Sequence, residues 1–446
     1  MRPPPPANVK PNSPDLGESW FDWNAIAPPP HAPGVVDETL RDGLQSPSAQ
    51  DPPLDKKLEL LSRAARLEIE GFALGFPASR PRQFEDALCL AKEIARQRLT
   101  IQACCAARTL SGDIAPIANI AQRSGLRVQV GLFIGASPLR QHAEGWSVEQ
   151  LLRLTDDAVT FAVREGLEVL YVVEDSTRST PETLSQLYSA GIRCGATRLC
   201  VADTVGHATP EGAAKIVHFV CELAASLDPR VRVEWHGHRD RGLDVANCLA
   251  AWAAGAERCH GTALGIGERA GNAPIEQLLV NLSLLGWRQQ SLAGLPEYVQ
   301  TAAEALGFSV PPHQPVVGED AFRTATGAHA AAVSKALTLG NAWLADRVFS
   351  SVPAALVGRQ QHLDVGPGSG EANVVAWLGE HGIVADAKTV ATVLSAAKRG
   401  SAVLSPSDIL ALLAGPRSEA ADAPQTRPLS EPPRAGTTSS GRARLR

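Results

Sequence analysis

The stretch Val35-Val36-Asp37-Glu38-Thr39-Leu40-Arg41-Asp42-Gly43 places a short β-branched run directly before a group of charged side chains. Similar apolar runs lie at 35–36, 69–75, 100–104, 127–133, 168–173, 198–202, 231–235 and 258–262. Amphipathic stretches fill the gaps, for example 54–67, 84–96, 148–164, 210–225 and 242–254, and they predict helices. Eight strand-plus-helix units over about 255 residues predict an α/β protein with a closed TIM (β/α)8 barrel. A doubly wound open sheet is the alternative.

The two ends of the chain differ from this repeating middle. Residues 1–30 are rich in Pro, Asn and Asp, and residues 416–446 are rich in Pro, Ser, Arg and Gly. Such compositions bury too little apolar surface to offset the entropy of ordering, so both ends are predicted to be disordered tails. The barrel is expected at residues 31–288. Residues 289–415 are Ala-rich and are expected to form a small helical C-terminal subdomain.

Composition limits the classes of partner. The chain has 446 residues, 44% of them hydrophobic, and a formal net charge of −5, with no basic patch that would indicate nucleic acid. Its eight cysteines include no C-x-x-C pair, which favours reduced core thiols. No apolar run approaches the roughly 20 residues that span a bilayer, and the start of the chain lacks a secretory signal. We therefore expect a soluble, cytoplasmic protein that acts on small molecules and does not bind membranes.

Polar residues at the predicted strand ends indicate a metal site. His236 and His238 are two residues apart at the end of the seventh run, so both imidazoles would point to one side. Asp42 follows the first run and Asn272 follows the eighth, which is its neighbour in a closed barrel. These oxygen and nitrogen ligands suit a divalent ion with open positions for substrate. A histidine pair alone is equally compatible with a structural or surface role. Arg41, next to Asp42, is expected to diverge from it.

Two other features have simpler interpretations. The glycine-rich segment 265–272 reads as a tight loop, because it lacks the Lys-Ser/Thr ending of a phosphate-binding loop. Cys104 and Cys105 have no identifiable base nearby in the sequence, so they are interpreted as buried core residues and not as nucleophiles.

Several ordered motifs together resemble the DRE-TIM metallolyases, and within them the 2-isopropylmalate, homocitrate and citramalate synthases. The motifs are Thr39-Leu40-Arg41-Asp42-Gly43 with Gln45, Gly75-Phe76-Pro77-Ala78, Glu174-Asp175, Asp203-Thr204-Val205-Gly206, His236-x-His238 and 265–272. The resemblance covers about residues 35–288 and continues more weakly through 316–329. It implies an acyltransferase of amino-acid biosynthesis that converts the acyl group into an alkyl group. The reaction would be a Claisen condensation of acetyl-CoA with a 2-oxo acid, followed by thioester hydrolysis.

The resemblance also implies residue roles. Asp42, His236 and His238, with Asn272 as a fourth ligand, would hold Mg²⁺, Mn²⁺ or Zn²⁺, which would chelate the oxo acid. The catalytic residues would be Arg41, Glu174 and His329, and the substrate-binding residues Arg41, Gln45, Arg178 and Thr204. Arg41 would stabilise an alkoxide. His329 would act as a base in the partner subunit of a homodimer.

Some positions depart from the family pattern. Arg239 stands where the family usually has Asn, Ala73 where a glutamate is common, and Leu44 where many synthases have Glu. We expect the chain to lack the C-terminal regulatory domain of feedback-inhibited isopropylmalate synthases, and hence to show no leucine inhibition by that route. The first hypothesis is a 2-isopropylmalate synthase of leucine biosynthesis, with homocitrate synthase and citramalate synthase as alternatives. A catalytically silent barrel that serves as a binding module is the alternative from a different class. A lyase is disfavoured because Thr262–Asn272 contains no cysteine.

Overall fold

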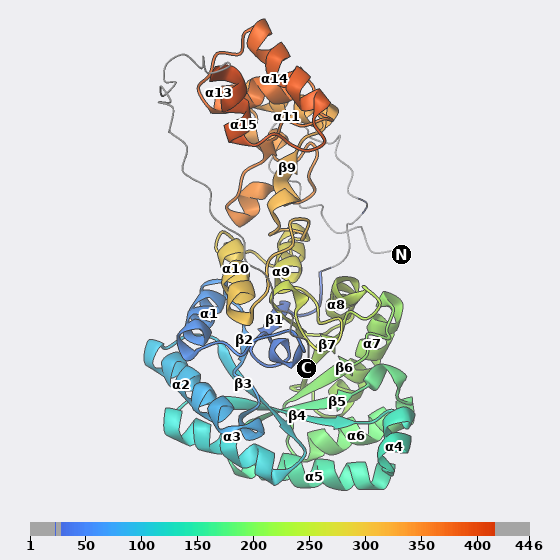
Figure 1. The fold of residues 1–446 in the computed structure, drawn as a ribbon. Helices are drawn as coiled ribbons and strands as arrows, with labels where there is room; N and C mark the ends of the chain where they lie inside the picture. Colours follow the sequence, from blue (N-terminus) through green and yellow to red (C-terminus); the bar gives the residue numbers. More distant parts are fainter. Residues whose placement is uncertain (1–22, 24–27, 415–446) are drawn as a thin grey trace, which may run out of the picture.

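The computed structural model describes residue 23 and residues 28–414. Eight parallel strands pair in sequence order and close into a barrel, and helices surround it (Figure 1). The strands are β1 Gly34–Asp37, β2 Gly71–Ala73, β3 Gln102–Arg108, β4 Val128–Gly135, β5 Glu168–Glu174, β6 Arg198–Asp203, β7 Arg232–Gly237 and β8 Arg258–Gly261. This architecture confirms the predicted TIM barrel and excludes the open sheet.

The outer helices follow the predicted amphipathic stretches closely. They are α1 Leu54–Arg66, α2 Pro81–Gln97, α3 Ser111–Ser124, α5 Val148–Arg164, α6 Pro181–Arg193, α7 Pro210–Leu227, α8 Asp244–Ala253 and α9 Ile275–Leu284. A short additional helix, α4 Pro138–Glu144, follows β4. The start of α7 shows how the sequence fixes a helix end: Thr209 Oγ1 accepts a hydrogen bond from Gly212 N, and Pro210 occupies the first turn.

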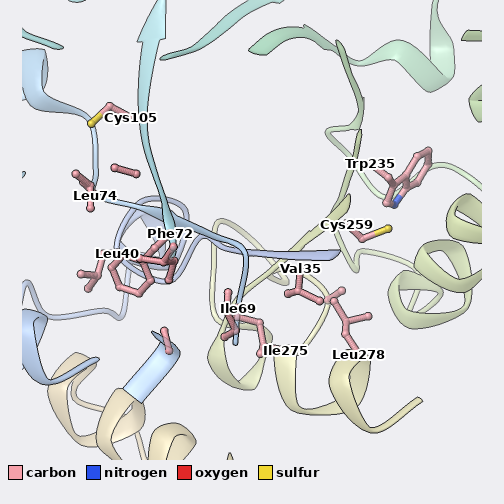
Figure 2. Close-up of a cluster of buried hydrophobic side chains, with 14 of the residues drawn as sticks. Val35, Leu40, Ile69, Phe72, Leu74, Cys105, Trp235, Cys259, Ile275 and Leu278 are labelled. Atoms are coloured by element: carbon pink, nitrogen blue, oxygen red, sulfur yellow. The ribbon is translucent and has the colours of Figure 1, made fainter. Parts of the chain in front are cut away.

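The barrel closes where β1 pairs with β8, with Gly34 opposite Arg258 and Asp37 opposite Gly261. Strand residues alternate between the barrel interior and the helical layer. Figure 2 shows the outward-facing Val35 beside Ile275 and Leu278 of α9. Val35 is completely buried, which contributes about 1.5–3 kcal/mol relative to an exposed side chain. An apolar layer therefore lies between the strands and the helices that surround them.

The chain after the barrel is mainly helical. Helix α10 Leu295–Leu306 packs on α1, and Tyr298 belongs to the same buried core as the barrel strands. The elements that follow are η6 Glu319–Phe322, β9 Arg323–Thr324, α11 Gly327–Thr338, α12 Ala342–Ala345, η7 Ala354–Val357, β10 His362–Leu363, α13 Glu371–Glu380, α14 Ala387–Arg399 and α15 Pro406–Ala414. Helices α11 and α13–α15 lie beyond α9 and α10 and have small hydrophobic cores of their own (Figure 1). The division at residue 288 stays a prediction.

Other expectations concern the chain as a whole. The predicted tails lie outside the described residues, except for residue 23 and residues 28–30. No helix within residues 28–414 combines the length and the apolar character needed to cross a membrane. All eight cysteines are free thiols, and five of them, including Cys104 and Cys105, are buried.

Candidate metal and substrate site

A cavity of about 210 Å³ lies inside the barrel, and residues from all eight strands or their carboxyl-terminal loops line it. Inward strand positions such as Val36 and Leu170 form its deeper wall. Residues that follow the strands, including Asp42, Thr204 and His238, also line it. The cavity therefore occupies the place where closed parallel barrels carry their active sites.

Asp42, His236 and His238 meet on one side of this cavity. Asp42 Oδ2 lies 3.3 Å from His236 Nε2 and 3.4 Å from His238 Nε2, and the two Nε2 atoms are 3.3 Å apart. His236 is in β7, while His238 follows the strand and pairs with Asn272 through an isolated bridge. The three side chains are buried. Folding thus brings together the ligand atoms that the sequence separates by about 200 residues.

The protonation states at this cluster suit metal ligation. Burial alone would raise the pKa of the Asp42 carboxyl, but Arg41 and the two imidazoles hold that pKa well below its ordinary value. The pKa of His236 is lowered to about 4, mainly by burial and also by nearby Arg41, although Asp42 opposes the shift. Burial also lowers the pKa of His238. At neutral pH the cluster therefore offers an ionised carboxylate and two neutral imidazoles, which are the ligand forms that bind cations.

Unpaired polar atoms provide an independent test of fit for a divalent ion. Within residues 28–414, Asn272 Oδ1 and Nδ2 are buried and have no hydrogen-bond partner. Leaving such a group unpaired costs about 1–3 kcal/mol. A β-carbon at Gly267 would meet both Asn272 Nδ2 and Asp42 Oδ1, so the amide lies beside the carboxylate. The residues present fit a divalent ion, with Asn272 placed to supply a fourth ligand.

A second group of possible ligands, Glu38, His236 and His260, does not fit a metal. His260 Nε2 lies 2.8 Å from Glu234 Oε2, and His260 Nδ1 lies 3.3 Å from Glu38 Oε1. Burial would lower the pKa of His260, but these two carboxylates raise it to about 9. A protonated imidazole has no lone pair for a cation. Both nitrogens of His260 instead donate to carboxylates.

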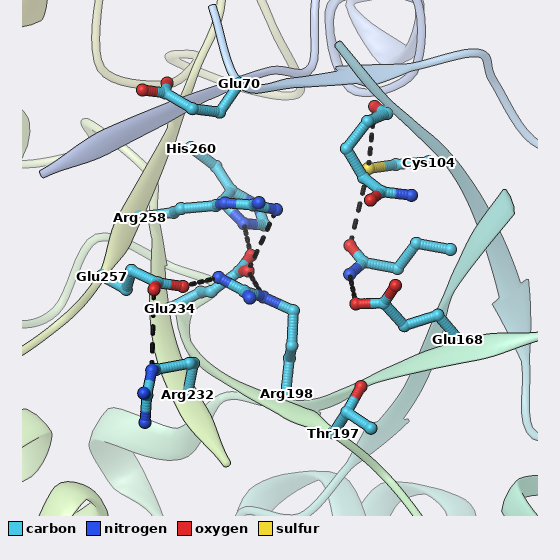
Figure 3. A network of polar contacts seen from close by, with 12 residues as sticks. Glu70, Cys104, Glu168, Thr197, Arg198, Arg232, Glu234, Glu257, Arg258 and His260 are labelled. Carbon is cyan, nitrogen blue, oxygen red and sulfur yellow. Dashed lines mark hydrogen bonds and ion pairs between the residues drawn. The ribbon is translucent and has the colours of Figure 1, made fainter. Parts of the chain in front are cut away.

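This imidazolium belongs to a buried network of charged residues that the sequence analysis missed. Figure 3 shows Glu234 between His260 and Arg198, with Arg258 and Glu257 beside them. The sequence did carry a signal, because charged residues interrupt the apolar runs 198–202, 231–235 and 258–262 or lie at their edges. Pairing them required the register of β6, β7 and β8.

Arg41 lies at the cavity wall, but the expectation that it diverges from Asp42 was wrong. Arg41 Nε donates to Glu38 Oε2 at 2.6 Å, and Arg41 Nη1 lies 3.5 Å from Asp42 Oδ2. The reason is local backbone geometry. The amides of Arg41, Asp42 and Gly43 all donate to the Glu38 carbonyl, so the chain turns tightly here and strand alternation no longer applies.

The other predicted site residues fall into two groups. Gln45, Glu174 and Thr204 line the cavity. Thr204 Oγ1 accepts a hydrogen bond from Asp175 N at 2.8 Å, which leaves its own proton for a ligand. Burial raises the pKa of Glu174, and Arg140 and Arg41 oppose that rise.

Arg178 and His329 lie apart from the residues that line the cavity. The Arg178 guanidinium donates to both carboxylate oxygens of Asp175, at 2.8 and 2.7 Å. His329 lies exposed in α11, with its ring stacked on Phe349 at a centroid distance of 3.9 Å. Neither side chain is brought to the metal ligands within this chain, so their predicted roles stay predictions.

The inner wall of the cavity is mainly apolar. Phe76 and Phe133 meet edge to face, with ring centroids 6.0 Å apart, and Leu170 and Val172 line the same space. Among the described residues that line the cavity, Arg41 is the one arginine or lysine, and it is already paired with Glu38.

Sequence comparisons match this chain to several synthases. Homocitrate synthase AksA of Methanopyrus kandleri is 35% identical over 82% of this chain and 86% of its own length. The 2-isopropylmalate synthase of Pyrococcus furiosus is 34% identical over 68% of this chain, and the match spans 61% of that relative. A putative (R)-citramalate synthase CimA of Methanopyrus kandleri is 31% identical over 84% of this chain and 70% of its own length.

Solved structures support the fold. Hydroxymethylglutaryl-CoA lyase from Pseudomonas aeruginosa aligns with a TM-score of 0.53 at 22% identity, over 64% of this chain and 96% of that one. A family model described as HMGL-like matches residues 32–298. The chain therefore belongs to the HMGL-like family, among the relatives of the 2-isopropylmalate, homocitrate and citramalate synthases, as the motifs predicted.

Proposed function

We propose that this protein is a divalent-metal-dependent synthase that condenses acetyl-CoA with a 2-oxo acid and releases CoA. The observation that carries this proposal is the cluster of Asp42, His236 and His238 beside Arg41 in a cavity with an apolar inner wall. The names of the relatives support the same reaction class. The 2-isopropylmalate synthases are only partly spanned, about three fifths of their length in one case, so the activity of a whole relative is not transferred directly.

The roles follow from the chemistry of the site. A divalent ion held by Asp42, His236, His238 and Asn272 would supply Lewis-acid polarisation of the oxo acid. The Thr204 hydroxyl is placed to donate to the substrate carboxylate. As the new carbon–carbon bond forms, the keto oxygen gains negative charge, and the Arg41 guanidinium stabilises it in a water-poor cavity.

Two further groups would transfer protons. His329 of a second copy would remove a proton from the methyl group of acetyl-CoA, because a neutral imidazole nitrogen can act as a general base. Glu174 has a raised pKa, which suits exchange of a proton with the substrate or with the water that cleaves the thioester. Gln45 would bind the oxo acid, and Arg178 would lie near its side chain. A homodimer and a cytoplasmic location belong to the same proposal.

The apolar residues that line the cavity favour an oxo acid with an apolar side chain. Phe76, Phe133, Leu170 and Val172 would contact that side chain. A second carboxylate, as in 2-oxoglutarate, would need a second cation to offset its desolvation. We therefore propose 2-oxoisovalerate, and hence a 2-isopropylmalate synthase, as the first choice.

A specific residue favours the alternatives. Arg140 lies close enough to Glu174 to lower its pKa, although its guanidinium now lies near Trp146 and Glu144. If Arg140 turns inward on binding, it provides the missing cation, and 2-oxoglutarate becomes the substrate of a homocitrate synthase. Pyruvate, the substrate of a citramalate synthase, would leave much of the apolar wall uncovered.

The test is CoA thiol release from acetyl-CoA in the presence of Mn²⁺ or Mg²⁺ and one oxo acid at a time. Release with 2-oxoisovalerate supports the first choice, and release with 2-oxoglutarate or pyruvate supports an alternative. An Arg41→Ala variant is the matched control, because it removes the guanidinium and leaves the metal ligands. No release with any oxo acid would refute the synthase and favour the silent binding barrel.

A further inference from the structure

Glu38 contacts the groups on both sides of it inside the barrel. Its Oε2 accepts from Arg41 Nε at 2.6 Å, and its Oε1 lies 3.3 Å from His260 Nδ1. Glu38 is 7% exposed and lines the cavity. We propose that Glu38 is a positioning residue that holds the Arg41 guanidinium at the cavity wall, a role that rests on the proposed synthase reaction.

The orientation of Arg41 depends on Glu38 in two ways. The Glu38 carbonyl accepts hydrogen bonds from the amides of Arg41 and Asp42, which fixes the backbone turn that carries both residues. The Glu38 carboxylate then holds Nε. With Nη1 near Asp42, Nη2 makes no hydrogen bond within residues 28–414 and remains for a substrate oxygen. A flexible arginine with one nitrogen held in this way presents a defined donor to the cavity.

The Glu38 carboxylate is itself held in place by His260. His260 donates to Glu38 through Nδ1. It also donates to Glu234 through Nε2, and Glu234 is paired with Arg198 (Figure 3). Because both oxygens of Glu38 are occupied and His260 is fixed on its far side, the carboxylate cannot turn without breaking a buried ion pair. A continuous series of buried polar contacts thus connects Arg198, through Glu234, His260 and Glu38, to Arg41.

Ala73 lies next to Glu38 in the barrel. Strands β1 and β2 pair with Val36 opposite Gly71 and Asp37 opposite Phe72, so the next pair in this register is Glu38 and Ala73. Both residues line the cavity. At Ala73 a glutamate is common in the resembling synthases. Ala73 lines the same cavity as Arg41, and here the carboxylate that holds Arg41 comes from the first strand.

The experiment compares Glu38→Gln, Glu38→Ala and the double variant Glu38→Ala/Ala73→Glu with wild type. Glu257→Gln is the control, because it removes a carboxylate from the same network through Arg198 and does not touch Arg41. The readouts are kcat and KM for the oxo acid that wild type uses, and the Kd of oxalate for the Mn²⁺-loaded protein. Oxalate presents two adjacent oxygens like those of a chelated 2-oxo acid. The Mn²⁺ Kd and the Tm are measured in parallel.

We expect Glu38→Gln to lower kcat about 100-fold while KM stays within about threefold, because the loss falls on the transition state. The oxalate Kd should rise about tenfold, and the Mn²⁺ Kd and the Glu257→Gln control should stay near wild type. The kcat of the double variant Glu38→Ala/Ala73→Glu should be about tenfold higher than that of Glu38→Ala. If Glu38→Ala does not fold, Glu38→Gln carries the test.

Wild-type kcat and oxalate affinity in Glu38→Gln would overturn the inference, as would a double variant that binds Mn²⁺ normally but recovers nothing. Equal losses of Tm and activity in Glu38→Gln and Glu257→Gln would also overturn it, since they would indicate a purely structural role. If wild type turns over no oxo acid, the proposed function fails, but the oxalate measurements still decide the role of Glu38.

Discussion

Replacement of Gly267 by alanine should weaken metal binding without unfolding the barrel. The added β-carbon would overlap Asn272 Nδ2 and lie 3.0 Å from Asp42 Oδ1. Ordinary carbon contacts are about 3.5 Å, so the carboxylate must retreat by roughly 0.5 Å and the amide by more. Metal–ligand distances tolerate only about 0.2 Å. The backbone at Gly267 does not have a positive φ, so alanine adds no backbone strain.

We expect the Mn²⁺ Kd of Gly267→Ala to rise about 10- to 100-fold, the range seen when groups that support metal ligands are disturbed. The assay is titration calorimetry of the metal-free protein with Mn²⁺. Gly112→Ala is the matched control, because a β-carbon there meets nothing within 4 Å and the position lies in α3. An Mn²⁺ Kd for Gly267→Ala equal to that of the control would refute the assignment of Asp42 and Asn272 to one ion.

Three further outcomes follow from the same structure. Mn²⁺ at 100 times its Kd should stabilise folded wild type by about 2.7 kcal/mol and so raise its Tm. His238→Ala should abolish this rise in Tm, and an undiminished rise would exclude His238 as a ligand. Burial raises the pKa of Glu276 from 4.5 to about 7. The protonated carboxyl therefore stabilises the fold below its unfolded pKa, and this stabilisation is lost as the pH rises through the folded pKa. Between pH 5 and pH 8, the free energy of unfolding measured in urea should fall by about 2 kcal/mol less in Glu276→Gln than in wild type. Equal losses would contradict that pKa. His329→Ala should bind Mn²⁺ and oxo acid normally but turn over slowly, and thiol release should reappear when it is mixed with Arg41→Ala chains; mixtures that stay inactive would exclude action across subunits.

The barrel was predictable because its signals are local. Each predicted strand overlaps an observed one, as 168–173 overlaps Glu168–Glu174, since β-branched runs and turn residues act over a few positions. The strand β9 Arg323–Thr324, the strand β10 His362–Leu363 and the short helix α12 were not predicted. Elements of two to four residues show no periodicity and are stabilised by tertiary contacts.

The candidate site was predictable in part for the same reason. Asp42, His236 and His238 stand in compact motifs, so their types and spacing were visible. Arg178 was expected near the substrate, but nothing in the sequence showed that Asp175, three residues earlier, binds its guanidinium.

The supporting charges could not be placed without the fold. The contact between Glu38 and His260 joins residues 222 positions apart in sequence number, and it exists because β1 pairs with β8 when the barrel closes. In the sequence, Glu38 stands among other charged residues after one apolar run, and His260 lies within another. The sequence did not show that these two side chains face one another in the barrel.

The central claim is that one divalent ion binds between the ends of β1 and β7. The most direct measurement is the anomalous difference map of a crystal soaked in Mn²⁺. The account predicts one strong peak within bonding distance of Asp42, His236 and His238, with Asn272 beside it. Saturating Mn²⁺ that gives no peak there, or a peak elsewhere in the barrel, would contradict it.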